Sequence, residues 1–556
     1  MNSIVDENSF DLLIDNNLVE EYRAVAKDQI FQIDPKMSLV VLNAIDFDMC
    51  DMGTLRYSFF PSLMTLDSDA ADSSNVGKIQ NNPNFSLYGQ GVLVGVIDTG
   101  IDYRHKAFRF SDGTSRIHSI WDQTIITEGK EPQGLPYGTE YTKSEINTAL
   151  LAENPLDIIP SNDEIGHGTK IAGIIAGSYD KANNFQGIVP QSEIIAVKLK
   201  QAKKYNKQIF CVPEDKLCYE ETDLIAGITY ITEKAKSLHR PLALCIGIGT
   251  SQGDHCGRGS TSNYLNYVTQ TPGIGVSVSG GNEGNNRRHY YGHTNGVEVS
   301  ELELNVDQKD TSFSMEIWVS APFRLTMDII SPTGENITDI YPRIGSCRKL
   351  DFIFTPSIVY VNNIISENLT GDQLILIRFV TSYSGIWKFR LSNIDEMTAS
   401  FHAWLPSNHL ISNDTFFLNP DPDTTLTSPG NAESPLVVAN YNQQSASIST
   451  NSSRGYTRYN RIKPDIAAPG VNILCPVPND KYTYTSGTSA SAAHAAGLIA
   501  MLLEWAVVKG NYTNISGAEI NKMIIRGARR KENLEYPNKI WGYGVTDIFS
   551  LFEKLI

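Results

Sequence analysis

Four polar residues, far apart in the chain, each lie where an apolar segment meets a glycine-rich turn. Asp98 ends the apolar run of "GVLVGVIDTG", and His167 precedes another in "GHGTKIAGIIAG". Asn282 lies in "SGGNEGN", and Ser489 lies in "GTSASAAHAAGLIAML". A carboxylate, an imidazole and a hydroxyl together can orient a base, accept a proton and attack a carbonyl carbon. A nearby amide can donate a hydrogen bond to the oxyanion that forms.

Each of these residues also has an ordinary structural interpretation. Ser489 can cap a helix that begins at the turn before it, and Asp98 can be a turn carboxylate. A single histidine such as His167 is more often structural than catalytic. Asn282 beside glycine indicates only a turn. The combination of the four, rather than any one of them, favours nucleophilic catalysis.

The segments around these residues predict an α/β fold. From residue 88 to 295, and again from 427 to 556, short apolar runs such as "EIIAVKLK" and "PLALCIGIG" alternate with segments of helical spacing. Such runs are typical of buried parallel strands with helices packed on them. Open sheets of this kind place their sites at the carboxyl ends of the strands, where the four polar residues are expected to meet.

Three further regions have a different composition. Residues 1–66 predict a small α+β unit, and residues 67–87 are polar and small, as in a linker. Between 296 and 426 the helical spacing disappears, and runs such as "SFSMEIWVS" and "GIWKFRLSN" indicate antiparallel strands. We therefore expect an all-β insertion, a sandwich or jelly roll, that interrupts the α/β fold.

Composition narrows the class of partner and the compartment. The net charge is −16, without a basic stripe, which argues against nucleic acid or an anionic membrane as the partner.

The seven cysteines are scattered and contain no CxxC pair, so we expect neither a disulfide framework nor a zinc site. The same pattern favours a reducing site of synthesis. We find neither a secretion signal nor an apolar run long enough to span a membrane. We expect a monomer without a cofactor. We also expect no bound metal, because the carboxylates of "NPDPDTT" (419–425) are better explained as a turn than as a cation site.

The four motifs and their order resemble the subtilase family of serine proteases. "VIDTGID", "GHGTKIAG", "SGGNEG" and "GTSASAAHAAG" correspond to its Asp, His, oxyanion and Ser segments, and "GIVPQSEIIAVKLK" and "KPDIAAPGVNI" to its connecting motifs. The resemblance implies a subtilisin-like parallel sheet and a serine endopeptidase. Ser489 would be the nucleophile, His167 the base and Asp98 the residue that orients it, while Asn282 would donate to the oxyanion.

The resemblance also implies a substrate-binding strand at "CIGIGT". Ile248 and Gly249 would border the S1 pocket, with Ser279 and Gly281 at its far wall. In two places the chain departs from the family pattern. Ala493 replaces a proline before His494, which we interpret as a structural histidine, and Gly247 replaces the substrate-lining serine. We expect catalysis to survive both changes.

The N-terminal unit, the β insertion, the acidic charge and the missing signal together resemble the Csp subtilases of spore-forming clostridia. That resemblance implies a prodomain that is cut by the enzyme itself and stays in the cleft as a plug. It also implies a protein substrate, the zymogen of a spore cortex hydrolase, and a location in the cortex or coat region of the spore. We expect autocleavage within "LMTLDS" (63–68), beside Thr65 or Leu66.

Two alternative functions are compatible with the same fold. One is a catalytically silent sensor or scaffold, for which the discriminating feature is a missing Asp, His or Ser. The other is an active subtilase whose substrate has no part in germination. The β insertion can bind sugars or a partner, or can simply make the protease more rigid.

Overall fold

A computed structural model describes residues 3–26, 29–43, 48–53, 55–67, 86–296, 298–395, 397–407 and 409–555. At its centre is a nine-stranded, mostly parallel sheet in the order β25-β24-β12-β10-β5-β8-β6-β7, with β26 paired to β24. Its strands are β5 (Leu93–Asp98), β6 (Ile117–Asp122), β7 (Thr139–Thr142), β8 (Glu193–Lys198), β10 (Leu242–Ile246), β12 (Ile274–Ser279), β24 (Leu436–Asn442), β25 (Ser447–Ile448) and β26 (Ile466–Pro469).

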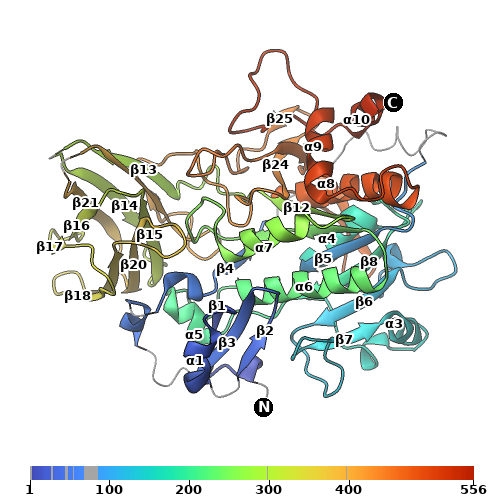
Figure 1. The fold of residues 1–556 in the computed structure, drawn as a ribbon, viewed down its shortest axis with the longest axis horizontal. Coiled ribbons are helices and arrows are strands. Elements are labelled where there is room, and N and C mark those ends of the chain that lie inside the picture. Colours follow the sequence, from blue (N-terminus) through green and yellow to red (C-terminus); the bar gives the residue numbers. More distant parts are fainter. Residues whose placement is uncertain are drawn as a thin grey trace.

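Helices cover both faces of this sheet (Figure 1). They are α3 (Lys143–Leu150), α4 (His167–Ala176), α6 (Glu221–Ser237), α7 (Ser260–Thr269), α8 (Thr488–Leu503), α9 (Gly517–Gly527) and α10 (Ile548–Leu555). Helix α5 (Lys204–Ile209) lies instead against the N-terminal unit, in a separate apolar cluster. Helices α4 and α8 pack on one face, α6 and α7 on the other. A hairpin of β27 (Ile473–Val477) and β28 (Lys481–Thr485) leads into α8.

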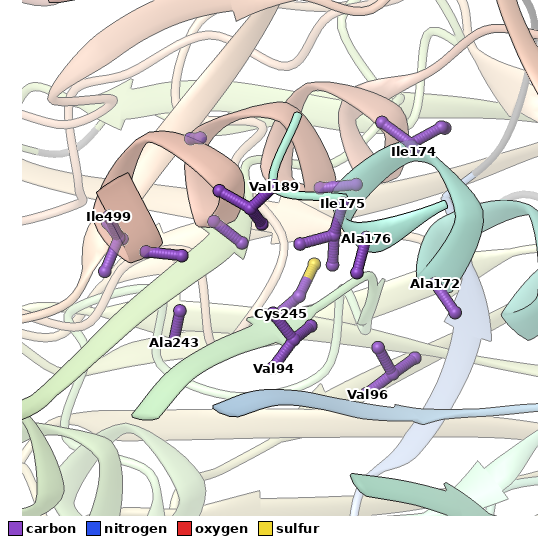
Figure 2. Packing of buried hydrophobic residues seen from close by; sticks show 14 of the residues in the cluster. Val94, Val96, Ala172, Ile174, Ile175, Ala176, Val189, Ala243, Cys245 and Ile499 are labelled. Carbon is purple, nitrogen blue, oxygen red and sulfur yellow. The ribbon is translucent and has the colours of Figure 1, made fainter. Parts of the chain in front are cut away.

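Side chains alternate between the two faces of each central strand and so contribute to the apolar core on either side of the sheet. Val94 and Val96 of β5 belong to the cluster with α4 and α8, whereas Leu93 and Ile97 belong to the cluster with α6 and α7. Figure 2 shows the first cluster, in which Val94 and Val96 lie opposite α4 and Ile499 of α8 packs above Ala243. Strands buried on both faces read as continuous apolar runs, which is why the sequence predicted them. The α/β prediction is confirmed.

The N-terminal unit packs against both the central domain and the insertion. Strands β1 (Ser9–Asp15), β2 (Ile30–Gln32) and β3 (Met37–Asn43) form an antiparallel sheet with α1 (Val19–Ala26). The short helices η1 (Ser3–Val5), η3 (Met49–Gly53) and η4 (Tyr57–Phe59) and the strand β4 (Leu63–Leu66) complete the unit. One apolar cluster contains residues of all three regions, including Phe10, Phe60, Phe210, Trp318 and Leu374.

The insertion consists of two antiparallel sheets that share one core. The first has the order β13-β22-β15-β20-β19-β18 and the second the order β17-β16-β21-β14-β23. The strands are β13 (His289–Thr294), β14 (Ser300–Val306), β15 (Phe313–Val319), β16 (Leu325–Ile330), β17 (Asn336–Ile340), β18 (Arg348–Phe352), β19 (Ser357–Ile364), β20 (Gln373–Thr381), β21 (Gly385–Asn393), β22 (Ala399–Trp404) and β23 (Phe416–Phe417). Strand β13 already pairs with β22, so this sheet begins before the expected boundary at 296. The jelly-roll connectivity stays a prediction.

The cysteine prediction was wrong for one pair. Cys50 in η3 and Cys347, just before β18, form a disulfide that joins the N-terminal unit to the insertion. They are 297 positions apart, so spacing along the chain carried no sign of their proximity. Five other cysteines are free and buried, namely Cys211, Cys218, Cys245, Cys256 and Cys475.

We expected no helix that could span a membrane. By length and composition alone, that expectation was wrong. Residues Thr488–Val508 form a helical stretch that is long and apolar enough, but 83% of its apolar window is buried inside the protein. A helix that is apolar all round belongs in a core as readily as in a membrane. Here α8 is buried along its whole length against the sheet and α4.

Candidate active site

Three of the predicted residues meet at the carboxyl end of β5, in the middle of the central sheet. His167 Nδ1 lies 2.7 and 2.8 Å from the two carboxylate oxygens of Asp98. Its Nε2 lies 3.1 Å from the Oγ of Ser489. The exposed fractions of Asp98, His167 and Ser489 are only 1, 2 and 1%. This is the geometry in which a carboxylate holds the imidazole in one tautomer and the free nitrogen takes a proton from the hydroxyl.

The ends of three core elements place these side chains. Asp98 is the last residue of β5, and the backbone N–H of Thr99 donates to its Oδ1 at 2.7 Å. His167 is the first residue of α4, whose backbone runs so close to Gly100 that a Cβ at Gly168 would lie 2.1 Å from the Gly100 carbonyl. Glycine at 168 is therefore required for the histidine to reach the aspartate.

Ser489 lies in the first turn of α8, where backbone N–H groups lack helical partners. Asn282, the predicted oxyanion residue, packs beside it. Its Oδ1 accepts hydrogen bonds from the backbone N–H and the hydroxyl of Thr488, both at 3.2 Å. This fixes the amide and leaves its Nδ2 group as a donor. The Ser489 N–H and the Asn282 amide together can bind a developing oxyanion.

A segment of the chain itself fills the adjoining cleft. Strand β4 lies between β11 (Ile248–Gly249) and β9 (Tyr219–Glu220) in an antiparallel three-stranded sheet. The pairs are Leu66 with Ile248 and Thr65 with Gly249. An extended peptide held by main-chain pairing on both sides is a familiar mode of peptide recognition. The sequence did not identify β9, because a two-residue strand has no periodicity of its own.

The residue whose carbonyl reaches the nucleophile is Asp67, one residue beyond the predicted pair. The backbone N–H of Ser489 donates to the Asp67 carbonyl oxygen at 3.0 Å, and the Asp67 N–H donates to the carbonyl of Gly247 at 3.3 Å. The peptide bond presented to Ser489 thus joins Asp67 to residue 68, which lies outside the described residues together with most of the expected linker. Autocleavage beside Thr65 or Leu66 stays a prediction, while the carbonyl that contacts Ser489 belongs to Asp67, one residue beyond that pair.

The Asp67 side chain is buried in a polar pocket. Its Oδ2 accepts a hydrogen bond from the Ser279 hydroxyl at 2.7 Å, so Ser279 contacts the residue in the pocket, as the resemblance implied. Burial raises the pKa of the Asp67 carboxyl to about 7; the Ser279 hydrogen bond and His167 partly oppose this rise, whereas Glu283 adds to it. The pocket therefore favours a neutral acid over a carboxylate.

The remaining predicted pocket residues lie around the same segment. Gly247 approaches the catalytic residues so closely that a Cβ there would lie 3.1 Å from the Cβ of Ser489. Ile248 and Gly249 form the strand β11 described above. The Gly281 N–H donates to the Thr488 hydroxyl at 3.2 Å, next to Asn282. Its place at the far wall of the pocket stays a prediction.

We expected a structural role for His494 and for the acidic turn at 419–425, and the structure shows what surrounds each of them. His494 is buried in α8, and burial lowers its pKa to about 4. In the acidic turn at 419–425, the Asp423 N–H donates to Asp421 and the Asp423 carboxylate pairs with Lys539 at 2.7 Å. Within the described ranges no group of three or more His, Cys, Asp or Glu is arranged to hold a metal ion.

A buried ionic cluster joins the N-terminal unit to the central domain close to the cleft. Lys203 Nζ lies 2.6 Å from Asp11 of β1, and Lys200 Nζ lies 2.7 Å from Asp223 of α6. Glu220 of β9 lies in the same cluster, and burial raises the pKa of its carboxyl to about 8. The sequence offered no sign of this cluster, since its members come from three separate segments.

Comparisons with known proteins agree with this geometry. The profile described as "Subtilase family" matches residues 89–300 and 411–544, the two halves of the α/β domain. The solved structure of the Clostridium perfringens CspB protease superposes with a TM-score of 0.77 and 29% identity, covering 86% of this chain and 96% of that one.

Curated relatives are longer proteins. The C5a peptidase of Streptococcus pyogenes serotype M6 is 24% identical over 469 residues, which is 78% of this chain and 36% of the peptidase. The PII-type proteinase of Lacticaseibacillus paracasei is 22% identical over 575 residues, 90% of this chain and 27% of the proteinase. The chain thus spans about a third of the length of these relatives. The two matched halves of the family profile cover most of the chain, and the chain is a member of the subtilase family.

Proposed function

We propose that the protein is a serine endopeptidase that cuts its own chain between Asp67 and Ser68 and keeps the N-terminal segment in the cleft as a plug. The observation that carries this proposal is the contact between the Asp67 carbonyl and the Ser489 N–H, beside a complete Asp98–His167–Ser489 triad. Because all three residues are present and in contact, we favour an enzyme over a silent scaffold.

The chemistry follows from the contacts. His167 Nε2 takes the proton of the Ser489 hydroxyl as Oγ attacks the Asp67 carbonyl carbon. The oxyanion is bound by the Ser489 N–H and the Asn282 amide. His167 then gives its proton to the leaving amine of Ser68, and water releases the acyl group as the new carboxyl terminus at Asp67.

The experiment compares the full chain with two serine variants. N-terminal sequencing of the purified protein is expected to find a new terminus at Ser68, and Ser489→Ala is expected to remain uncut. Ser491→Ala is the matched control, because Ser491 lies on the same helix but its hydroxyl donates to the Ala468 carbonyl at 3.1 Å. Cutting in Ser489→Ala, or an uncut wild-type chain that is folded, would refute self-cleavage.

We further propose that the released activity belongs to spore germination, with a cortex hydrolase zymogen as the substrate and the spore cortex or coat as the location. The likeness to CspB supports this, because it extends over 86% of the chain rather than over the α/β domain alone. Purified enzyme is expected to cut such a zymogen at one bond, and Ser489→Ala is not. Failure to cut it while a peptide substrate is hydrolysed would indicate a different physiological substrate.

A further inference from the structure

We propose that the Cys50–Cys347 disulfide is a covalent attachment site for the cut N-terminal segment, so that a thiol reductant is needed to release the plug. This inference rests on the proposed self-cleavage. Cys50 lies before Asp67 in the chain and Cys347 lies after it, in the insertion. Hydrolysis of the Asp67–Ser68 bond consumes one water and leaves the disulfide unchanged. Residues 1–67 then stay covalently joined to residues 68–556.

The disulfide lies in an interface that is already ordered by other contacts. Arg378 of β20 donates to the carbonyl of Met49, next to Cys50, at 2.6 Å. Further along the same segment, the Tyr57 hydroxyl donates to Glu316 of β15 at 2.6 Å. The Cα atoms of the two cysteines are 5.3 Å apart, a separation that disulfides normally span. The fold thus holds Cys50 and Cys347 together independently of the bond between them.

The tether changes how the plug can leave. A cut segment held only by non-covalent contacts leaves once the protein is diluted below the dissociation constant. A tethered segment that leaves the cleft stays at an effective concentration of about a millimolar, as for a short flexible linker, and binds again. Dilution alone therefore leaves the cleft closed. Transient opening, by contrast, is still possible while the tether is intact.

Reduction removes the covalent link between the two parts. A dithiol supplies two electrons and two protons, the Cys50–Cys347 bond becomes two thiols, and the dithiol becomes its own disulfide. Both cysteines are half-buried, so a small reductant has access to them, whereas the five free cysteines are buried. Mild reduction is thus expected to act on this pair without unfolding the protein.

The experiment uses the full chain, produced in an oxidising host, purified without reductant and quenched with N-ethylmaleimide under denaturing conditions. We expect one covalent species without reductant, and two fragments, 1–67 and 68–556, after dithiothreitol. The denatured, unreduced chain contains seven cysteines and is expected to take up five labels. Separate fragments without reductant, or seven labels, would overturn the disulfide.

Variants separate this inference from the proposed function. Cys50→Ser and Cys347→Ser are each expected to give two separate fragments without reductant, and the cut itself shows that these variants fold. Cys475→Ala, which changes a buried free cysteine, is expected to behave like the wild type. An uncut chain with five labels refutes self-cleavage but supports the disulfide. A cut chain whose fragments stay together in Cys50→Ser under denaturing conditions refutes the tether.

Discussion

Replacing Asp67 by asparagine tests whether the cleft holds its last residue as a neutral acid. In the closed cleft burial raises the pKa of the Asp67 carboxyl from 3.8 to about 7. When the segment leaves the cleft, the carboxyl meets water and its pKa returns to the ordinary value. The closed state therefore binds the proton more tightly, and closure is strongest below pH 4. It weakens as the pH rises toward 7 and is constant above that value.

The size of the effect follows from the same two values. Each pH unit between about 4 and 7 costs the closed state about 1.4 kcal/mol, a factor of about ten in the opening equilibrium. From pH 5 to pH 7 opening should thus increase about fiftyfold, because the carboxyl in the closed cleft is itself half ionised at pH 7. The amide introduced by Asp67→Asn does not titrate, so in that variant this increase is absent.

A fluorophosphonate that reacts with Ser489 measures the opening, because the nucleophile is buried while the segment is in place. The labelling rate of the processed wild type is divided by that of processed Asp67→Asn at each pH, which removes the pH effects that the two proteins share. The ratio is expected to rise about fiftyfold between pH 5 and pH 7 and to level off above pH 7. A ratio that stays flat over this range would refute the burial of Asp67 in the pocket.

Three further variants test the site and its supports. Asn282→Ala should slow self-cleavage during refolding about 100- to 1000-fold, measured by quenched time points, because one oxyanion donor is lost; an unchanged half-time would exclude that role. Lys203→Met removes the cation 2.6 Å from the buried Asp11 carboxylate and leaves only Lys200, 3.9 Å away, so it should lower the free energy of unfolding by up to about 3–5 kcal/mol, measured by denaturant titration. Gly168→Ala should prevent processing, since its Cβ meets the Gly100 carbonyl; a wild-type yield of cut protein would contradict the close approach.

The central sheet and the catalytic residues could be predicted from sequence because their signals are local. β5 is a buried strand that ends in Asp98, and α8 is an apolar helix that begins beside Ser489. Residue types at the ends of such elements indicate where side chains converge. Proton transfer depends on two distances, 2.7 Å from His167 to Asp98 and 3.1 Å from His167 to Ser489. The packing of α4 and α8 on the sheet sets both of them.

Two contacts between separate regions were not predicted. The Cys50–Cys347 bond and the Asp11–Lys203 pair each join the N-terminal unit to a part of the chain far away in sequence. No periodicity or spacing reports such contacts. Both of them attach the N-terminal unit, which suggests a common physical reason. Under the proposed self-cleavage the segment stays bound after its backbone is cut, and it then needs contacts that do not depend on chain connectivity.

The register of strand β4 in the cleft was not predicted either, and it determines which peptide bond reaches Ser489. The run "LMTLD" is compatible with several antiparallel alignments on β11. Because side chains alternate between the two faces of a strand, a slip by one residue moves every side chain to the opposite face. The alignment in this structure buries Leu63 in an apolar cluster and places the Asp67 side chain on Ser279. A slip by one residue would place Leu66 at the Ser279 hydroxyl and would move the apolar side chains away from their cluster. The apolar anchors upstream therefore select which peptide bond reaches Ser489, and the polar pocket has to accept an acid there.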